Sequence, residues 1–277
     1  KEYRAICRKC IYFRQKPKRR SQWLKKIESF FLTLFILVIL LCGKRLWDYY
    51  RQSEESQEKY QQVEEIAFPS GEEETDLGEP GNTNTIAPKD DYDYSSLLQI
   101  NPECIGWLKI EGTDISYPVV QGRDNSFYLS HDFLKKRAIC GCLFVDFRND
   151  LSAKEEHVII YGHQMKDGSM FKQLNGYKKE DFFLQHNRIT FYIKSKKYQY
   201  MVAAVFVTNA EQSRDYYNYL HKETRMEQME YLKEMEKYQQ YSTGVKLEPD
   251  DELLSLSTCE YSSRNGRLIV LARRLNE

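Results

Sequence analysis

The sequence predicts a mainly β fold, a closed barrel or a sandwich, preceded by an apolar helix and an acidic linker. From residue 91 onward, short runs rich in Val, Ile, Leu, Phe and Tyr alternate with turn residues, a pattern typical of all-β folds. Before them lie an apolar run, residues 30–42, and an acidic stretch, residues 48–90, that ends rich in Pro and Gly. At 277 residues the chain is long enough for one sizeable core with appendages.

The net charge of zero hides a strong segregation of charge. Eleven Lys or Arg residues and a single acid precede Glu28, whereas residues 48–95 hold fourteen acids and three bases. The two blocks lie on opposite sides of the apolar run. A basic arm, residues 1–29, can bind nucleic acid, but the apolar run that follows at once favours a cytoplasmic tail, and no nucleic-acid partner is expected.

The apolar run FFLTLFILVILLC, residues 30–42, contains one polar residue, Thr33. It is short against the roughly 20 apolar residues of a spanning helix, but flanking Trp23 and Trp47 lengthen it and mark interfaces. A cleaved signal peptide and a buried core helix are the alternatives. No small-residue cleavage site follows Cys42, and the charged flanks disfavour a core helix. We therefore expect a single membrane anchor over residues 30–47.

The basic cluster before the anchor predicts that the N-terminus lies in the cytoplasm and that everything after residue 47 lies outside the cell. Residues 48–90 are then expected to form a flexible acidic stalk, because this composition cannot bury a core. A helix over residues 48–68 stays open. The folded domain is expected to span residues 91–277.

Within that domain the pattern predicts about eight strands. A short helix ends at Asn101-Pro102, and residues 125–133 are helical or irregular. A short helix is expected over residues 169–177, and a long one over residues 213–241, where Met and Leu recur at a spacing of three as a packing face. The runs with strand character are residues 107–112, 113–121, 141–147, 157–162, 188–195, 197–210, 253–258 and 267–273.

The last two strands carry the first chemical signal. Cys259 ends one of them and Arg267 begins the next, across a polar turn. A thiolate is a nucleophile, and a guanidinium beside it can donate hydrogen bonds to a developing oxyanion or to a substrate backbone. Taken alone, the pair also fits a buried thiol followed by a surface Arg. Arg264, in the turn, ranks second for the same role.

The second signal lies about a hundred residues upstream. In HVIIYGHQM a strand delivers His163 after Gly162, at the start of a turn. A Cys nucleophile needs a His that is distant in sequence and near in space to exchange protons. Together, LSTCEY, GRLIV and YGHQM resemble the sortases, the cysteine transpeptidases of Gram-positive cell surfaces, and within them class B. The resemblance extends from about Tyr92 to the end of the sequence.

The resemblance implies an eight-stranded β-barrel with an N-terminal helix and a long helix between strands 6 and 7. It implies that Cys259 is the nucleophile, His163 the proton donor and acceptor, and Arg267 the oxyanion or substrate ligand. The residues that class B enzymes use to bind substrate match Asn125, Leu129, Ser257 and Glu260 here, and Thr258 lies among them. Asn125 also fits a helix N-cap, and Glu260 a solvated turn acid.

The implied reaction cleaves a C-terminal sorting motif of the NPxTN or xPxTG type after Thr and transfers the acyl group to an amine. The expected partners are surface proteins that carry the motif, an acceptor amine from a peptidoglycan precursor or a pilin Lys, and the lipid bilayer. A surface cysteine peptidase that only hydrolyses, a pilin-polymerising enzyme and a silent surface scaffold are the alternatives.

No cofactor or catalytic metal is expected, because no His has metal-ligand spacing to another. His157 should lie far down the barrel, whereas His131, His186 and His221 lie in polar surroundings and are expected at the surface. The Cys7/Cys10 pair has no second pair nearby. Cys140 and Cys142 are expected to be packed rather than bridged.

Overall fold

The computed structural model describes residues 22–69, 92–151, 157–218 and 225–275. They form two units, residues 1–49 and residues 50–277, of which the second contains the barrel. The elements in chain order are α1 (Gln22–Ala67), α2 (Tyr94–Ile100), β1 (Cys104–Ile110), β2 (Ser116–Val120), η1 (Phe127–Leu129), β3 (Leu143–Val145), β4 (His157–Tyr161), η2 (Phe171–Lys178), α3 (Glu180–Gln185), β5 (Arg188–Ile193), β6 (Lys196–Asn209), α4 (Arg214–Asn218), α5 (Arg225–Met235), η4 (Glu236–Tyr238), β7 (Leu253–Glu260) and β8 (Gly266–Arg274).

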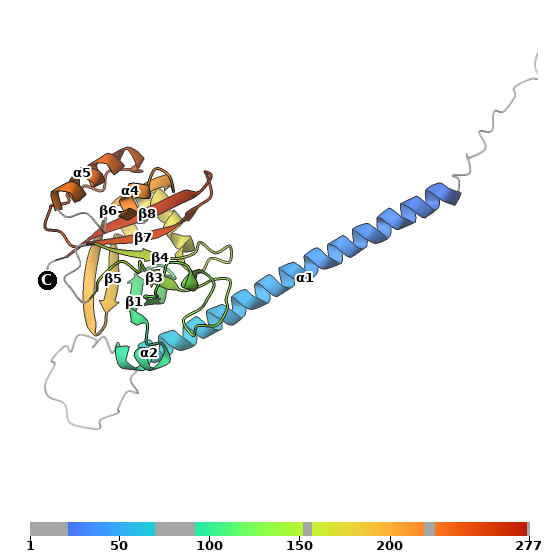
Figure 1. Ribbon diagram of the computed structural model, residues 1–277, viewed down its shortest axis with the longest axis horizontal. Coiled ribbons are helices and arrows are strands. Elements are labelled where there is room, and N and C mark those ends of the chain that lie inside the picture. Colours follow the sequence, from blue (N-terminus) through green and yellow to red (C-terminus); the bar gives the residue numbers. More distant parts are fainter. Residues whose placement is uncertain (1–21, 70–91, 152–156, 219–224, 276–277) are drawn as a thin grey trace, which may run out of the picture. The chain divides into compact units, whose positions relative to one another are not determined.

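The strands close into a barrel in the order β1-β2-β3-β4-β7-β8-β6-β5, with β5 pairing back to β1 (Figure 1). Among the described residues there are eight strands, which confirms the predicted barrel. Closure leaves no free sheet edge, so the backbone groups of every strand can pair. Two of the pairs, β2 with β3 and β4 with β7, are parallel, and the rest are antiparallel.

Apolar residues on both faces of β8 explain why helices cover part of the barrel. Leu268 and Val270 point into the barrel core, while Ile269 and Leu271 belong to a second cluster on the outside. Leu232 and Met235 of α5 complete that second cluster, which confirms the expected packing face. A continuous apolar run is the pattern of a strand that is buried on both faces.

Between β6 and β7 the described α-helix ends at Met235, before the expected end of the helix over residues 213–241, and residues 219–224 lie outside the described residues. Within the described residues this stretch holds two short α-helices, α4 and α5, followed by η4. The packing periodicity of Leu232 and Met235 is real, but it belongs to α5, which ends at Met235. Helix α3 was not anticipated from the sequence.

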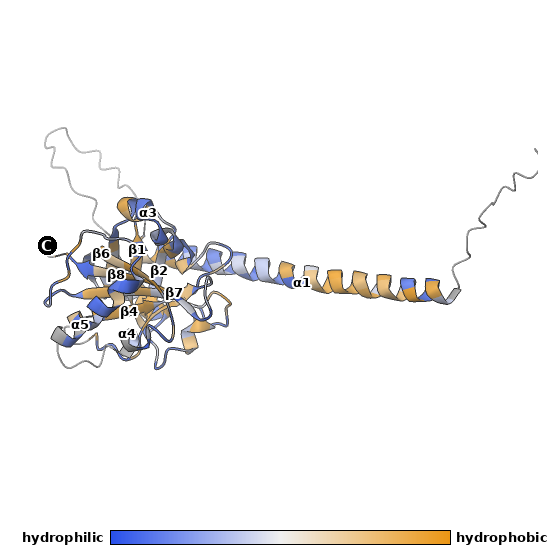
Figure 2. Cartoon of the chain, turned by 90° about the horizontal axis from the view of Figure 1, so that it is seen from above, coloured by the Kyte–Doolittle hydropathy of each residue, from blue (hydrophilic) through white to orange (hydrophobic). Residues whose placement is uncertain are grey.

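Helix α1 runs from Gln22 to Ala67, far beyond the expected anchor over residues 30–47. Its first unit, residues 22–49, is exposed and apolar in the middle (Figure 2). Of the helices that the structure describes, α1 alone has the length and composition needed to cross a membrane.

Residues 50–67 of α1 belong to the folded unit, although the sequence analysis placed them in the stalk. Five side chains on one helix face are buried against the barrel: Ser53, Ser56, Tyr60, Val63 and Ala67. The acidic residues of this segment lie mostly on the exposed face, so the charge count conceals an amphipathic helix. The expected start of the folded domain at residue 91 is therefore too late. Residues 70–90 of the expected stalk lie outside the described residues.

Candidate active site

Cys259 and Arg267 face each other across the last two strands. They are direct partners in the antiparallel pair of β7 and β8, so their side chains emerge on the same face of the sheet. The Arg267 Nη1 lies 3.8 Å from the Cys259 Sγ and also donates to the Gly266 carbonyl at 3.0 Å. Both side chains are half-buried. Arg264, the second-ranked candidate, is exposed in the turn.

His163 reaches the same place through the parallel pairing of β4 with β7. Tyr161, the last residue of β4, is in register with Ser257, so His163 follows this pair by two residues in the loop, as Cys259 does on β7. Two hydrogen bonds hold the start of the loop to β7: Gly162 N donates to the Ser257 carbonyl at 3.2 Å, and Thr258 Oγ1 donates to the Gly162 carbonyl at 2.8 Å. The structure therefore brings the three expected catalytic residues to one end of neighbouring strands.

The His163 ring has a defined partner. Its Nε2 lies 2.7 Å from the backbone carbonyl of Leu129 in η1. A carbonyl oxygen only accepts, so Nε2 carries a proton in this contact, and Nδ1 is the nitrogen left to take up or release one. The turn that contains Leu129 therefore fixes the orientation of the imidazole.

Asn125 and Leu129 lie at the two ends of this turn. Asn125 Nδ2 donates to the Asp146 carboxylate at 3.0 Å, and its Oδ1 accepts from the Phe147 backbone N–H at 3.0 Å. Asp124, not Asn125, accepts the backbone N–H groups at the start of η1. The Leu129 side chain is 41% exposed. Of the two, Leu129 is thus the one whose side chain is open to a ligand.

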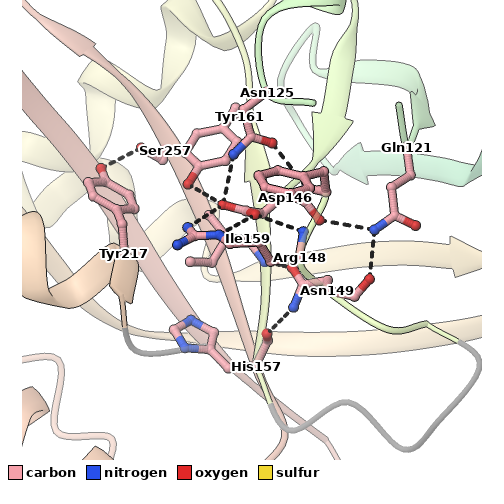
Figure 3. Close-up of polar contacts among 11 residues, drawn as sticks. Gln121, Asn125, Asp146, Arg148, Asn149, His157, Ile159, Tyr161, Tyr217 and Ser257 are labelled. Atoms are coloured by element: carbon pink, nitrogen blue, oxygen red, sulfur yellow. Dashed lines mark hydrogen bonds and ion pairs between the residues drawn. The ribbon is translucent and has the colours of Figure 1, made fainter. Parts of the chain in front are cut away.

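Asp146 is the centre of a network that the sequence analysis missed (Figure 3). Its buried carboxylate accepts from Arg148 Nε at 2.8 Å and Nη2 at 2.7 Å, from the Tyr161 hydroxyl at 2.9 Å and from Asn125. Burial raises the pKa of Asp146, but these donors outweigh it and lower the pKa below its ordinary value. The network joins the ends of β3 and β4 to the turn that carries Leu129.

Ser257, Thr258 and Glu260 flank the thiol and are all buried. The Ser257 hydroxyl lies 2.8 Å from the Tyr217 hydroxyl, and Thr258 holds Gly162 as described. Glu260 pairs with Lys178 and accepts from the Ser262 backbone N–H at 2.8 Å. The interpretation of Glu260 as a solvated turn acid is therefore wrong. Burial raises its pKa, but Lys178 and Ser262 outweigh burial and the pKa is lowered.

The other described His residues make contacts of their own within the protein. His157 is buried, with its Nε2 2.6 Å from Ser255 Oγ, and burial lowers its pKa to about 3. His131 is half-buried and stacks on Phe127 at 4.0 Å, and His186 contacts the Glu111 carbonyl at 3.0 Å. The surface expectation for His221 falls outside the described residues.

Three thiols besides Cys259 lie in the folded unit. Cys104, Cys140 and Cys142 are buried and free, so the expectation that Cys140 and Cys142 are packed rather than bridged is confirmed. Cys7 and Cys10 lie outside the described residues. Over the ranges that the structure describes, no group of three or more His, Cys, Asp or Glu is arranged to hold a metal ion.

Comparison with known proteins agrees with this geometry. The Sortase domain family matches residues 108–275. The chain therefore belongs to the sortase family of cysteine transpeptidases.

Its curated relatives place it in class B of that family. Sortase B of Staphylococcus aureus is 29% identical over 255 residues, covering 90% of this chain and 97% of the relative. Sortase B of Listeria monocytogenes is 34% identical over 180 residues, covering 63% and 70%.

Solved structures match as well. A sortase B of Bacillus anthracis in complex with AAEK2 has a TM-score of 0.67 at 28% identity and covers 81% of this chain and 97% of its own. The Staphylococcus aureus sortase B–substrate complex has a TM-score of 0.60 at 34% identity, with coverages of 66% and 84%.

Proposed function

We propose that the protein is a membrane-anchored transpeptidase that joins proteins bearing a C-terminal sorting motif to an amine. The observation that carries this proposal is the convergence of a thiol, a guanidinium 3.8 Å from it and an imidazole two residues beyond the end of the neighbouring strand. The substrate-bound sortase B of Staphylococcus aureus supports a peptide-like substrate class. The motif is of the NPxTN or xPxTG type.

In the first step the Cys259 thiolate attacks the carbonyl carbon of the motif Thr. The oxygen gains negative charge, and Arg267 donates hydrogen bonds to it from its place beside the thiol. His163 then gives a proton to the leaving amine as the C–N bond breaks. A thioester remains on Cys259, and the C-terminal fragment leaves.

In the second step an amine attacks the thioester carbonyl. His163 accepts the proton of the incoming amine, the C–S bond breaks, and an amide forms with the thiolate as leaving group. The acceptor is an amine of a peptidoglycan precursor or a pilin Lys. If water takes the place of the amine, the same residues catalyse hydrolysis.

For substrate binding we propose that Leu129 contacts the peptide directly, because its side chain is exposed beside His163. Asn125, Ser257, Thr258 and Glu260 make their side-chain hydrogen bonds within the protein, and we propose that they shape the groove that receives the motif. For the anchor we propose that residues 30–47 of α1 span the membrane with the basic residues 1–29 in the cytoplasm.

The test uses the full chain in detergent with quenched peptides of both motif types, with and without an amine acceptor. The proposal predicts cleavage of one motif type and, with the amine, an amide product detected by mass spectrometry. Both should disappear in the Cys259→Ala and His163→Ala variants. Cleavage that never yields amide would replace the transpeptidase with a hydrolase, and a folded protein that cleaves neither peptide would refute the substrate class.

A further inference from the structure

The segment of α1 that follows the apolar run contacts the loop on which His163 lies. The Ser53 hydroxyl donates to the Asp167 carboxylate, four residues beyond His163. Asp167 also accepts from the Ser169 backbone N–H at 3.0 Å and the Ser169 hydroxyl at 2.7 Å. Burial raises the pKa of Asp167, but these donors outweigh it, so the pKa is lowered and the carboxylate stays ionised.

The loop is closed on itself and tied to the barrel. Gln164 and Met170 form an isolated bridge, and Phe171 N donates to the His163 carbonyl at 2.9 Å. Met170 N also donates to the Tyr117 hydroxyl at 3.1 Å. Ser53 of α1 contacts the tip of this closed loop through Asp167.

A second contact from α1 leads to the other partner of His163. The Tyr60 hydroxyl donates to the Gly141 carbonyl at 2.6 Å, and the Tyr60 ring packs edge-on against Tyr117 at 5.5 Å. Cys142 N, next to Gly141, donates to the Tyr128 carbonyl at 3.0 Å. Tyr128 directly precedes Leu129, whose carbonyl contacts the His163 ring.

The backbone at Gly141 packs closely against the backbone of η1. Gly141 has a φ of +60°, and a Cβ there would come within 2.4 Å of the Tyr128 carbonyl oxygen. Residues 140–142 therefore lie directly against η1, with Tyr60 on their other side. A third contact, Lys59 Nζ to Asp132 Oδ2 at 3.5 Å, ties α1 to the loop after η1.

We infer that residues 50–67 of α1 orient His163, with Ser53 holding the loop that carries the ring and Tyr60 holding the turn that its Nε2 contacts. Ser53 and Tyr60 are thus positioning residues that touch neither substrate nor thiol. The inference rests on the proposed role of His163. It gives the helix that leads from the apolar run a part in the chemistry as well as in attachment.

The test compares Ser53→Ala and Tyr60→Phe with Val63→Ala in the full chain in detergent. Val63 is the control, since it is buried on the same helix face and its apolar side chain takes no part in the hydrogen bonds to Asp167 and Gly141. Transpeptidation gives kcat and KM. A second measurement needs no substrate. Cys259 is alkylated with iodoacetamide at a series of pH values, and mass spectrometry of the peptide that carries Cys259 gives the rate at each pH. The resulting pH profile reports coupling between the thiol and the imidazole. His163→Ala gives the profile expected when the imidazole is lost.

We expect Ser53→Ala and Tyr60→Phe to lower kcat by about tenfold or more with KM unchanged, because small misplacements of a reacting group carry large rate losses. Their alkylation profiles should move toward that of His163→Ala, while Val63→Ala keeps the parent profile. If the parent ligates no peptide but the profiles still move, the positioning role stands and the substrate proposal fails. Unchanged profiles in both variants overturn the positioning role, whatever happens to activity.

Discussion

At the scale of single residues, two strand registers bring the candidate catalytic residues together. The pairing of β7 with β8 sets Cys259 opposite Arg267, and the pairing of β4 with β7 brings His163 alongside. A slip of one residue in either register would turn a side chain to the other face of the sheet. Gly162 N and Thr258 Oγ1 hold the second register where β4 ends.

The first residue-scale prediction concerns Arg267. Replacing it with Ala should lower kcat/KM roughly 10²- to 10³-fold, the usual loss when one oxyanion donor is removed. Arg264→Ala is the control, because this exposed residue in the turn before β8 has the same charge. Quenched-peptide kinetics with an amine acceptor measure both. Equal losses in the two variants would mean that general positive charge, rather than the contact with the thiol, is what matters.

The second residue-scale prediction concerns pH and His157. Burial lowers the pKa of His157 from 6.5 to about 3, so between these values the unfolded chain binds a proton that the folded protein does not. This contribution to stability is complete above about pH 6.5 and is lost as the pH falls, by at most about 1.4 kcal/mol per pH unit.

Urea unfolding at pH 7.5 and at pH 5 measures this loss in the parent and in His157→Gln. The variant should lose less of its free energy of unfolding between the two pH values than the parent does, whatever its absolute stability. An identical loss in both proteins would assign the acid sensitivity to other groups, such as the carboxylate of Asp146, whose pKa is lowered.

At the scale of elements, the strands followed from the sequence and one helix boundary did not. Alternating apolar runs located all eight strands to within a few residues, because each strand buries a continuous face in the barrel. Residues 50–67 looked like stalk because Glu and Gln dominate their composition. Their buried face consists of two Ser, a Tyr, a Val and an Ala, which carries a weak hydrophobic signal.

The element-scale prediction separates the two faces of α1. Val63 is buried in the main core, whereas Ile66, one turn of helix away, is 40% exposed. Val63→Ala should lower the free energy of unfolding by about 1–3 kcal/mol through lost burial and the cavity it leaves. Ile66→Ala should change it by less than about 0.5 kcal/mol. Thermal or urea unfolding measures both, and equal effects would show that residues 50–67 do not pack on the barrel in solution.

The candidate site was predictable only in part, because some of its residues lie in short recognisable motifs and others matter only through partners that are distant in the sequence. Cys259, His163 and Arg267 lie next to strand ends that can be recognised in the sequence, so a resemblance in short motifs located them. Asp146 and Lys178 follow no such signal. Their importance arises from partners that the fold brings together, Arg148 and Tyr161 for the first and Glu260 for the second.

At the scale of the whole molecule, the chain has two units, residues 1–49 with the apolar run and residues 50–277 with the barrel. The full chain should sediment with membranes and resist carbonate extraction, because one helix is long and apolar enough to span a bilayer. A chain beginning at residue 50 should stay in the soluble fraction and keep its activity, since that residue begins the compact unit. Full-length protein released by carbonate would argue against a spanning helix.

Intact-protein mass spectrometry shows whether Cys259 forms a thioester with a sorting peptide, as we propose. The full chain, mixed with an NPxTN-type or xPxTG-type peptide and quenched in acid, should gain the mass of the acyl fragment up to the Thr. The adduct should map to Cys259, be absent in Cys259→Ala, and disappear when an amine is added, as amide product accumulates. An adduct on another residue, or peptide turnover that persists in Cys259→Ala, would contradict the account.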